Sequence, residues 1–495
     1  MSAKDKESME KLEPDTDTTN KSEGFIKLRR ELGLFSAVNL ILGVMIGSGI
    51  FVSPASALEH SGSVALCLII WTVSGLISLL GALSFAELGT VVGKSGAEYA
   101  YFQEAFGKIH KYWGPLPSFI CAWIYVVILR PAEVAIIVMT FAEYAMQPFT
   151  SDLHSDYKST AVKLTSLSAL FIMTYINITS VKLFVKVQNV FGVCKVFACL
   201  IVIGGGIYEI AKGNTAHLNK GFEGSHWNPG GIALALYSGL WAYDGWNSVT
   251  VVTEEIINPG VNVPLSISIA VPLITALYVF MNVAYMTVLS YSEMTSVPAV
   301  AVAFGYRVLG PASFLIPVGV AIATFGCAMS VQFGVTRVCY TAARGGHMLE
   351  VLSYINVNRL TPAPAVALQA FLTAIFIVVG NIRTLIEFAS WFLWFFYGLA
   401  MVALLVLRKT QGRRPRPYRV PTPVPIFVLL VAIFLSVLPI VHDPSVKYLM
   451  AIGFIVMGVA VYTIFVYYKK TPTAILRTIT FLTQVLLNSV PPSNE

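Results

Sequence analysis

The sequence predicts an all-α, polytopic membrane protein with 12 transmembrane helices. Of its 495 residues, 56% are hydrophobic and only 12% are charged, whereas an ordinary soluble domain has about 25% charged residues. The apolar residues gather into twelve runs of the length that a transmembrane helix needs. Two of these runs, the first and the sixth, are interrupted near their middle. These three observations together predict the fold class.

A polar loop at 212–229 separates the fifth span from the sixth. The predicted bounds of the twelve spans are 34–58, 64–88, 113–146, 161–180, 187–211, 230–254, 264–289, 312–336, 364–381, 385–407, 424–440 and 446–468. Residues 1–33 have no apolar period and are predicted to form a disordered cytoplasmic tail. Residues 470–495 form a second cytoplasmic tail, whose weak amphipathic pattern suits a membrane surface.

Basic residues concentrate in the connections that an even number of spans places on the side of the N-terminus. They are Lys182, Lys186, Arg344, Arg359, Arg408, Lys409, Arg413, Arg414, Arg416, Arg419, Lys469 and Lys470. Cytoplasmic loops of membrane proteins carry an excess of Lys and Arg. We therefore expect a multi-pass integral membrane protein with both termini in the cytoplasm.

The first span contains a glycine cluster, Gly43, Gly47 and Gly49, with Ser48 between the last two. Each glycine costs a helix about 1 kcal/mol relative to alanine, and in lipid a freed backbone group must find another partner. N–H groups of the second half-helix can bind an anion, and carbonyls of the first half can bind a cation. The cluster therefore predicts a site for a zwitterion. The alternative is a close helix–helix contact, because Gly43 and Gly47 have Gly-x-x-x-Gly spacing.

The sixth span carries a matching interruption, Trp241-Ala242-Tyr243-Asp244-Gly245-Trp246-Asn247. Spans one to five occupy 34–211, spans six to ten occupy 230–407, and two additional spans occupy 424–468. Five is odd, so the second block enters the membrane from the opposite side. Paired interruptions in two inverted repeats indicate a transport site at the membrane midplane.

Several motifs resemble those of the light-chain subunits of heteromeric amino-acid transporters, the L-type amino-acid transporter family of the amino acid–polyamine–organocation superfamily. The matching stretches are Gly47-Ser48-Gly49-Ile50-Phe51, 82–89, Ser95-Gly96-Ala97-Glu98-Tyr99, 235–243, Thr253-Glu254-Glu255, Asn258-Pro259, Gly346-His347, 361–365 and Arg416-Pro417-Tyr418. The resemblance covers about 34–470. It implies the five-plus-five inverted-repeat (LeuT-like) fold with broken helices 1 and 6, sodium-independent exchange of amino acids by alternating access, and a place in the plasma membrane.

The resemblance also implies roles for particular residues. The substrate carboxylate would contact backbone at Met45, Ser48 and Gly49, and the amine would contact carbonyls at Met45, Trp241 and Asp244. Trp241 would be the gate, and Lys195 would face the place that sodium occupies in sodium-coupled relatives. The full predicted substrate-binding set is Met45, Ile46, Gly47, Ser48, Gly49, Trp241, Tyr243, Asp244, Gly245 and Asn247.

Asp244 bears on the choice of substrate. The motif around it looks most like that of the exchanger that takes dibasic amino acids and cystine along with neutral ones. An intramembrane acid is a functional candidate by default, although an aspartate also suits the N-cap of a half-helix. A neutral-only transporter and an amino-acid sensor with little flux remain alternatives.

Other intramembrane charges have structural interpretations. Arg130 and Glu133 are three residues apart, so they are expected to pair on one helix face. Lys195 is close enough to a helix end to extend its ammonium group to the interface. We find no sequence pattern of a hydrolase or of a metal site, so the sequence predicts no enzyme, no cofactor and no nucleic-acid partner.

The predicted partners are small-molecule amino acids and the lipid bilayer. The resembled family uses a cysteine in the loop after span three for a disulfide to a single-span glycoprotein heavy chain. Here that loop, 147–156, contains no cysteine. A heavy chain is therefore possible, but a disulfide to it at this loop is not.

Overall fold

The computed structural model describes residues 30–150, 155–297, 300–379, 382–442, 446–470 and 473–491. Within these ranges the chain is almost entirely helical, and the one sheet pairs β1 (Ile355–Asn356) with β2 (Ser489–Val490). The all-α prediction is confirmed. The predicted N-terminal tail lies outside the described residues, apart from 30–33.

The first half of the chain contains eight α-helices, all in the described ranges. They are α1 (Leu34–Met45), α2 (Gly49–Ser61), α3 (Val64–Val92), α4 (Glu98–Phe106), α5 (Leu116–Ile124), α6 (Arg130–Thr150), α7 (Ser155–Thr179) and α8 (Val181–Ala211). A π-helical turn, Tyr125–Leu129, joins α5 to α6, so the two form one span of the kind predicted for 113–146.

The described part of the second half begins with the broken sixth span and ends with a helix in the C-terminal tail. Its α-helices are α9 (Pro229–Ala242), α10 (Ser248–Val251), α11 (Pro259–Val288), α12 (Tyr291–Ser296), α13 (Val300–Val308), α14 (Leu315–Arg344), α15 (Ala363–Val379), α16 (Ile382–Thr410), α17 (Pro423–His442), α18 (Val446–Val461) and α19 (Thr473–Leu487). Single turns of 3-10 helix cover Leu218–Lys220, Thr253–Glu255, Gly310–Phe314 and Glu350–Ser353, and a π-helix, Tyr462–Tyr467, continues α18.

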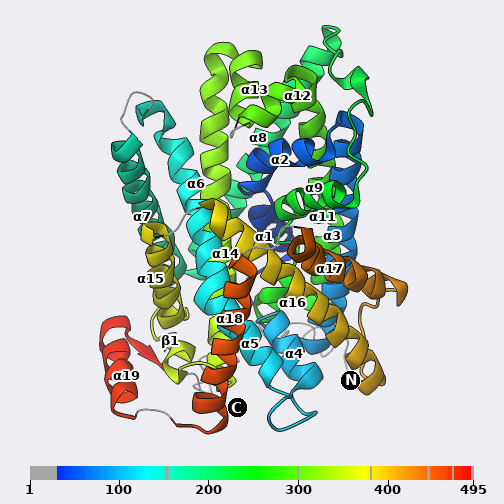
Figure 1. Ribbon diagram of the computed structural model, residues 1–495. Coiled ribbons are helices and arrows are strands. Elements are labelled where there is room, and N and C mark those ends of the chain that lie inside the picture. Colours follow the sequence, from blue (N-terminus) through cyan, green and yellow to red (C-terminus); the bar gives the residue numbers. More distant parts are fainter. Residues whose placement is uncertain are drawn as a thin grey trace, which may run out of the picture.

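All twelve predicted spans correspond to helices. Among the described residues, eight helices are long and apolar enough to cross a membrane, and α1 with α2 forms a ninth span bent by 48°. The other three predicted spans are the short apolar helices α15 and α17 and the broken pair α9 and α10. The sequence did not predict α12 and α13, which lie at the opposite end of the bundle from α4 and α19 (Figure 1).

The first broken span lies in the interior of the helix bundle. Helix α1 packs against α8, α11 and α14, and α2 packs along α9. Helix α1 is buried from Asn39 to Met45. This part of the helix therefore contacts protein and does not face lipid. This central position brings the two predicted interruptions together.

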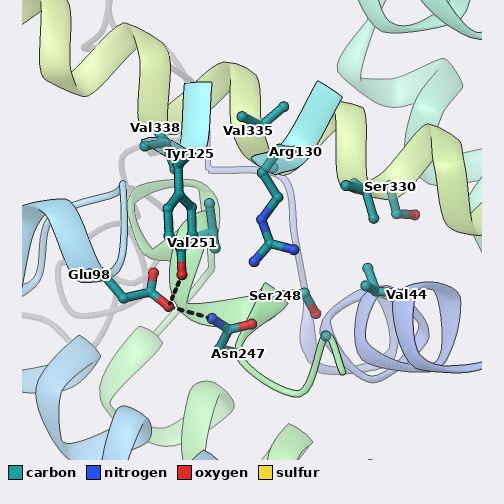
Figure 2. Close-up of a pocket in the computed structure, with 13 residues that line it drawn as sticks. Val44, Glu98, Tyr125, Arg130, Asn247, Ser248, Val251, Ser330, Val335 and Val338 are labelled. Carbon is teal, nitrogen blue, oxygen red and sulfur yellow. Dashed lines mark hydrogen bonds between the residues drawn. The ribbon is translucent and has the colours of Figure 1, made fainter. Parts of the chain in front are cut away.

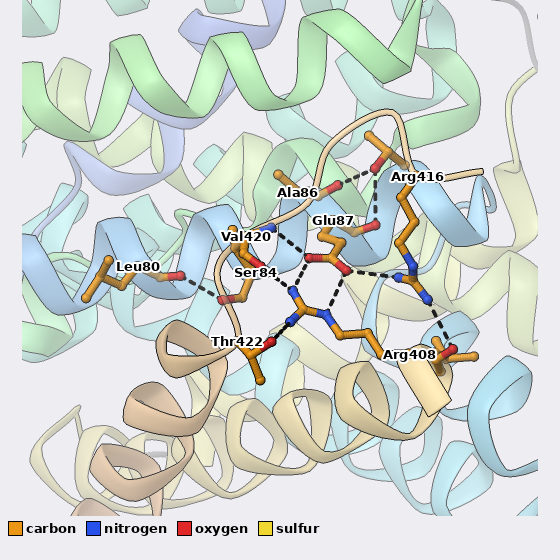
Figure 3. Close-up of polar contacts among 10 residues, drawn as sticks. Leu80, Ser84, Ala86, Glu87, Arg408, Arg416, Val420 and Thr422 are labelled. Atoms are coloured by element: carbon orange, nitrogen blue, oxygen red, sulfur yellow. Dashed lines mark hydrogen bonds and ion pairs between the residues drawn. The ribbon is translucent and has the colours of Figure 1, made fainter. Parts of the chain in front are cut away.

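A buried ionic cluster joins α3 to α16 and to the loop that follows it (Figure 3). The carboxylate of Glu87, which is fully buried, accepts hydrogen bonds from Arg408 Nε at 3.0 Å and from Arg416 Nη1 at 2.9 Å. It also accepts one from the backbone N–H of Val420 at 2.9 Å. Two guanidinium groups therefore depend on one carboxylate for their charge compensation.

We expect Glu87→Gln to destabilise the protein by about 3–5 kcal/mol, because removing one partner of a buried ion pair leaves uncompensated charge in a medium of low dielectric constant. The measurement is the unfolding free energy of the purified protein in detergent. The matched control is Glu104→Gln, which breaks a partly exposed pair with Arg414 and should cost at most about 1 kcal/mol. Equal losses in the two variants would contradict the role assigned to Glu87.

Candidate substrate-binding site

The first span breaks where the glycine cluster predicted. Helix α1 ends at Met45, Ile46 leaves the helical region with φ −78° and ψ 78°, and α2 begins at Gly49. Ser48 precedes α2 without capping it, since its side chain makes no cap hydrogen bond. The first N–H groups of a helix have no intrahelical partner. The start of α2 can therefore bind an anion such as a carboxylate.

The sixth span breaks after Ala242, where α9 ends, and resumes as α10 at Ser248. Gly245 has φ +100° in this turn, a conformation that is open to glycine and strained for other residues. Asp244 does not occupy the N-cap position of α10, which is Asn247. Its carboxylate instead takes part in the charge cluster described below, so the capping alternative for Asp244 is wrong.

The two breaks are packed against each other. A Cβ atom added to Gly49 would lie 2.5 Å from Ala242 Cα, and one added to Gly245 would lie 2.2 Å from Val44 Cγ1. The hydroxyl of Tyr278, on α11, donates a hydrogen bond to the Met45 carbonyl at 2.6 Å and lies 3.3 Å from the Ala242 carbonyl. One buried side chain therefore contacts the last turn of both half-helices.

These contacts bear on the predicted amine ligands. The Met45 carbonyl already accepts hydrogen bonds from Tyr278 and from the Gly47 N–H at 2.8 Å, and a carbonyl oxygen has two lone pairs. The Trp241 carbonyl accepts the Asp244 N–H at 3.2 Å and is also an acceptor for the Tyr243 N–H at the end of α9. Both predicted carbonyls therefore already have protein donors in this arrangement.

Gly43 and Gly47 serve close packing. A Cβ atom at Gly43 would overlap the Gln188 side chain of α8, and one at Gly47 would lie 2.7 Å from Cys327 Sγ of α14. Close helix packing, the alternative interpretation of the cluster, is therefore confirmed for Gly43 and Gly47, although Gly47 also lies within the break. The site for a zwitterion stays a prediction.

A small cavity of about 40 Å³ adjoins the two breaks (Figure 2). Its lining residues are Val44, Glu98, Tyr125, Arg130, Gly245, Asn247, Ser248, Val251, Ser330, Val331, Gly334, Val335 and Val338. The Arg130 side chain extends into the space between Glu98 and Ser248. Glu98 accepts hydrogen bonds from Asn247 Nδ2 at 2.8 Å and from the Tyr125 hydroxyl at 3.4 Å.

Arg130 is the centre of a charge cluster beside this cavity. Its Nη1 atom lies 2.6 Å from Glu133 Oε2 and 3.6 Å from Asp244 Oδ2. The Tyr397 hydroxyl donates to the other Asp244 oxygen at 2.5 Å. The predicted pair of Arg130 and Glu133 is confirmed, and its arginine also reaches Asp244 in the broken helix. Within the described residues of this cluster, three carboxylates, including Glu98, surround one guanidinium group.

The two predicted aromatic residues lie outside this cavity. Trp241 lines a smaller one of about 10 Å³ on the side of Asp244, together with Trp394 and Tyr397. Tyr243 is fully buried, and its ring centroid lies 5.0 Å from that of Tyr278 and 6.0 Å from that of Trp71. Trp241 is therefore positioned to cover Asp244, while Tyr243 contributes to the packing behind the break.

Lys195 does not extend to the interface. It is fully buried, and its Nζ atom donates a hydrogen bond to the Gly43 carbonyl of α1 at 2.6 Å. A Cβ atom added to Gly326 of α14 would lie 3.3 Å from the same nitrogen. The ammonium group therefore lies between α1 and α14, and the interpretation of Lys195 as an interfacial lysine is wrong.

With this geometry in view, the similarity to known proteins is specific. The family described as "Amino acid permease" matches residues 32–461. The chain belongs to the amino acid permease family. Human "b(0,+)-type amino acid transporter 1" is 42% identical across 99% of this chain and 97% of its own length. The human "Cystine/glutamate transporter" is 37% identical across 95% and 92% of the two chains, and the mouse "Asc-type amino acid transporter 1" is 37% identical across 91% and 84%.

Sequence reasoning missed Glu98, Tyr125 and Ser330 as residues of the cavity and assigned Arg130 to structure alone. Charge offered a usable signal, because an ionisable residue within a span is a functional candidate by default. Arg130 met that criterion. Glu98 was part of a motif that matched the family, but nothing in its spacing placed it near Asn247, which is 149 residues away.

We expect Gly49→Ala to lower amino-acid uptake at least tenfold and to reduce stability by about 1–3 kcal/mol, as overpacking does, because the added methyl group would meet the backbone of Ala242. Uptake into proteoliposomes and thermal unfolding are measured together. The matched control is Gly204→Ala in α8, where an added Cβ meets nothing within 4 Å. Normal uptake by Gly49→Ala would show that α2 and α9 need not approach closely.

Proposed function

We propose that this protein is a sodium-independent amino-acid exchanger that carries neutral and dibasic L-amino acids by alternating access. The observation that carries the proposal is the meeting of two broken helices beside a cavity lined by Arg130 and Glu98, with Glu133 and Asp244 next to the same arginine. The start of α2 would bind the substrate carboxylate. The ends of α1 and α9, with the carbonyls of Trp241 and Asp244, would bind the amine. The repeats 34–211 and 230–407 would rearrange around this point, with α17 and α18 outside them.

The position of Lys195 supports sodium independence. Its ammonium group, at 2.6 Å from the Gly43 carbonyl, already supplies a fixed positive charge between α1 and α14. A sodium ion bound there would face like-charge repulsion at close range in a medium of low dielectric constant. The lysine would therefore replace the ion in holding α1 against α14.

The charge cluster supports transport of dibasic substrates. When all groups are ionised, the negative charge of Glu98, Glu133 and Asp244 exceeds the single positive charge of Arg130. Such an excess of negative charge costs free energy in a buried site unless a cation is bound. A substrate ammonium or guanidinium group would complete the compensation by reaching Asp244. The human relative at 42% identity is named a b(0,+)-type transporter. That name describes the relative, and it agrees with this proposal.

Asp244→Asn should weaken competition by arginine and lysine by about 1.5–3 kcal/mol, the range for a hydrogen bond to a charged group, or roughly tenfold or more in concentration. Leucine should compete almost as well as before, because it places no charge near this carboxylate. The assay is inhibition of one labelled tracer in proteoliposomes, with Glu293→Gln, in the short helix α12, as the control.

Three outcomes of this assay discriminate between the alternatives. An equal loss for leucine and arginine in the Asp244→Asn variant would mean that the carboxylate shapes the site without contacting the substrate. No inhibition of the wild type by arginine would identify a neutral-only transporter. Binding of amino acids without counterflow from preloaded liposomes would favour a sensor.

We also propose that both termini are cytoplasmic, that the protein resides in the plasma membrane, and that any glycoprotein heavy chain is held without a disulfide. The excess of Lys and Arg in the connections named above supports this orientation. All six cysteines of the chain are free, and five of them are buried. Cys194 is half-buried and lies within the membrane-spanning helix α8, which places its thiol away from a partner's extracellular domain.

Native membranes run on a gel with and without reductant should give the same mobility for this protein, because its cysteines are inaccessible to a partner's thiol. Ser151→Cys, which introduces a cysteine between α6 and α7, is the positive control. If a heavy chain docks nearby, this variant can form a reducible dimer with it. A larger band of the wild type that disappears on reduction would contradict the proposal.

A further inference from the structure

One nitrogen atom of Arg130 has two carboxylates close to it, and it donates a hydrogen bond to only one of them. Nη1 lies 2.6 Å from Glu133 Oε2 and donates to it, whereas Asp244 Oδ2 lies 3.6 Å from the same nitrogen. The second distance is too long for a hydrogen bond. Glu133 therefore accepts the bond that Asp244 would otherwise be placed to accept.

The position of Glu133 on α6 favours this pairing. Glu133 lies in the first turn of the helix, three residues after Arg130, so the two side chains are neighbours on one helix face. Both residues are buried, with 8% of Arg130 and 5% of Glu133 exposed. A guanidinium group at this depth needs a carboxylate of the protein beside it, because uncompensated buried charge costs free energy.

Asp244 is bound on its other side by a neutral group. The Tyr397 hydroxyl donates to Asp244 Oδ1 at 2.5 Å, and the ring centroid of Tyr397 lies 4.7 Å from that of Trp246. Asp244 also lines the small cavity that it shares with Trp241. Its negative charge is therefore compensated less completely than that of Glu133, and its carboxylate borders open space.

We propose that Glu133 is a positioning residue, which holds Arg130 apart from Asp244 and so keeps Asp244 available to the cationic side chain of a dibasic substrate. This inference rests on the proposed function, in which the substrate cation reaches Asp244. If Glu133 loses its charge, a shift of about 1 Å brings Arg130 Nη1 to the distance of a charge-assisted hydrogen bond from Asp244, about 2.8 Å. The new ion pair would then compete with the substrate cation for this carboxylate.

Glu98 offers a comparison that separates the position of Arg130 from the total charge of the cluster. It lines the cavity beside Arg130 (Figure 2), and it accepts its hydrogen bonds from Asn247 and Tyr125. Glu98→Gln removes one negative charge, as Glu133→Gln does, but it leaves the bond between Arg130 and Glu133 in place. The two variants must differ if Glu133 acts by positioning Arg130, and they must agree if only the sum of the charges matters.

The test is inhibition of labelled leucine uptake into proteoliposomes that contain the purified full-length protein. For each variant, the concentration of arginine that gives half-inhibition is divided by the concentration of unlabelled leucine that does so. Glu133→Gln should raise this ratio at least tenfold. Glu98→Gln should raise it threefold at most. Glu133→Asp, which keeps a negative charge beside Arg130, should also stay within threefold of the wild type.

A double variant, Arg130→Gln with Glu133→Gln, tests the same claim even if Glu133→Gln alone fails to fold. It removes the competing guanidinium group together with its partner, so nothing remains to pair with Asp244 in place of the substrate. Its ratio should therefore stay within threefold of that of the wild type.

Equal losses in Glu133→Gln and Glu98→Gln would overturn the proposal. A tenfold rise of the ratio in Glu133→Asp or in the double variant would do so as well. The wild type provides the separate check on the proposed function. If arginine does not inhibit the wild type, dibasic transport itself is refuted, whereas equal inhibition of the wild type and of Glu133→Gln refutes the positioning role alone.

Discussion

The structure depends on one constraint, namely that backbone polar groups released at two helix breaks must be satisfied away from water. The two breaks pack against each other, and one side chain contacts both. Gly49 lies against Ala242, Gly245 lies against Val44, and the Tyr278 hydroxyl reaches the carbonyls at the ends of both first half-helices. The N–H groups at the start of α2 are ones that a helix leaves without an intrahelical partner, and such groups suit a carboxylate. They are the groups to which the proposed function assigns the substrate carboxylate.

Buried charged side chains are subject to the same constraint as the backbone groups, because their charge must be compensated away from water. Glu87 has two arginines and a backbone N–H as partners, whereas the cluster around Arg130 has more carboxylates than cations. The first arrangement is complete and ties α3 to α16. The second is incomplete in the absence of a ligand, and incomplete compensation in a buried site is what a cationic substrate can correct. The contrast distinguishes a structural ionic cluster from a candidate binding cluster in one molecule.

The sequence was sufficient for features that depend on local pattern. Hydropathy located the twelve spans, and the glycine cluster and the Trp241–Asn247 stretch located both breaks. It failed where the outcome depends on which spans become neighbours. Nothing in the spacing of Glu98, Arg130 and Asp244 indicates that three separate elements bring them together, and the partner of Tyr278 is 233 residues away. Helices α12 and α13 were missed because they are short and lie in a connection where apolar periodicity is weak.

Helix α14 and its neighbour α6 both border the broken helices. Helix α14 presents Ser330 and Val335 to the cavity beside the breaks, and Cys327 Sγ donates to the carbonyl of Val44 at 3.0 Å. Helix α6 begins with Arg130, the centre of the charge cluster. Movement of α1 relative to α8 would have to break the bond of Lys195 to Gly43. Movement of α6 and α14 as a unit would preserve the pair of Arg130 and Glu133 and change the position of Arg130 relative to Glu98 of α4 and to Asp244. The contact of 3.6 Å between Arg130 and Asp244 is the longest in the cluster. In the proposed function it is therefore the contact that a cationic substrate would replace.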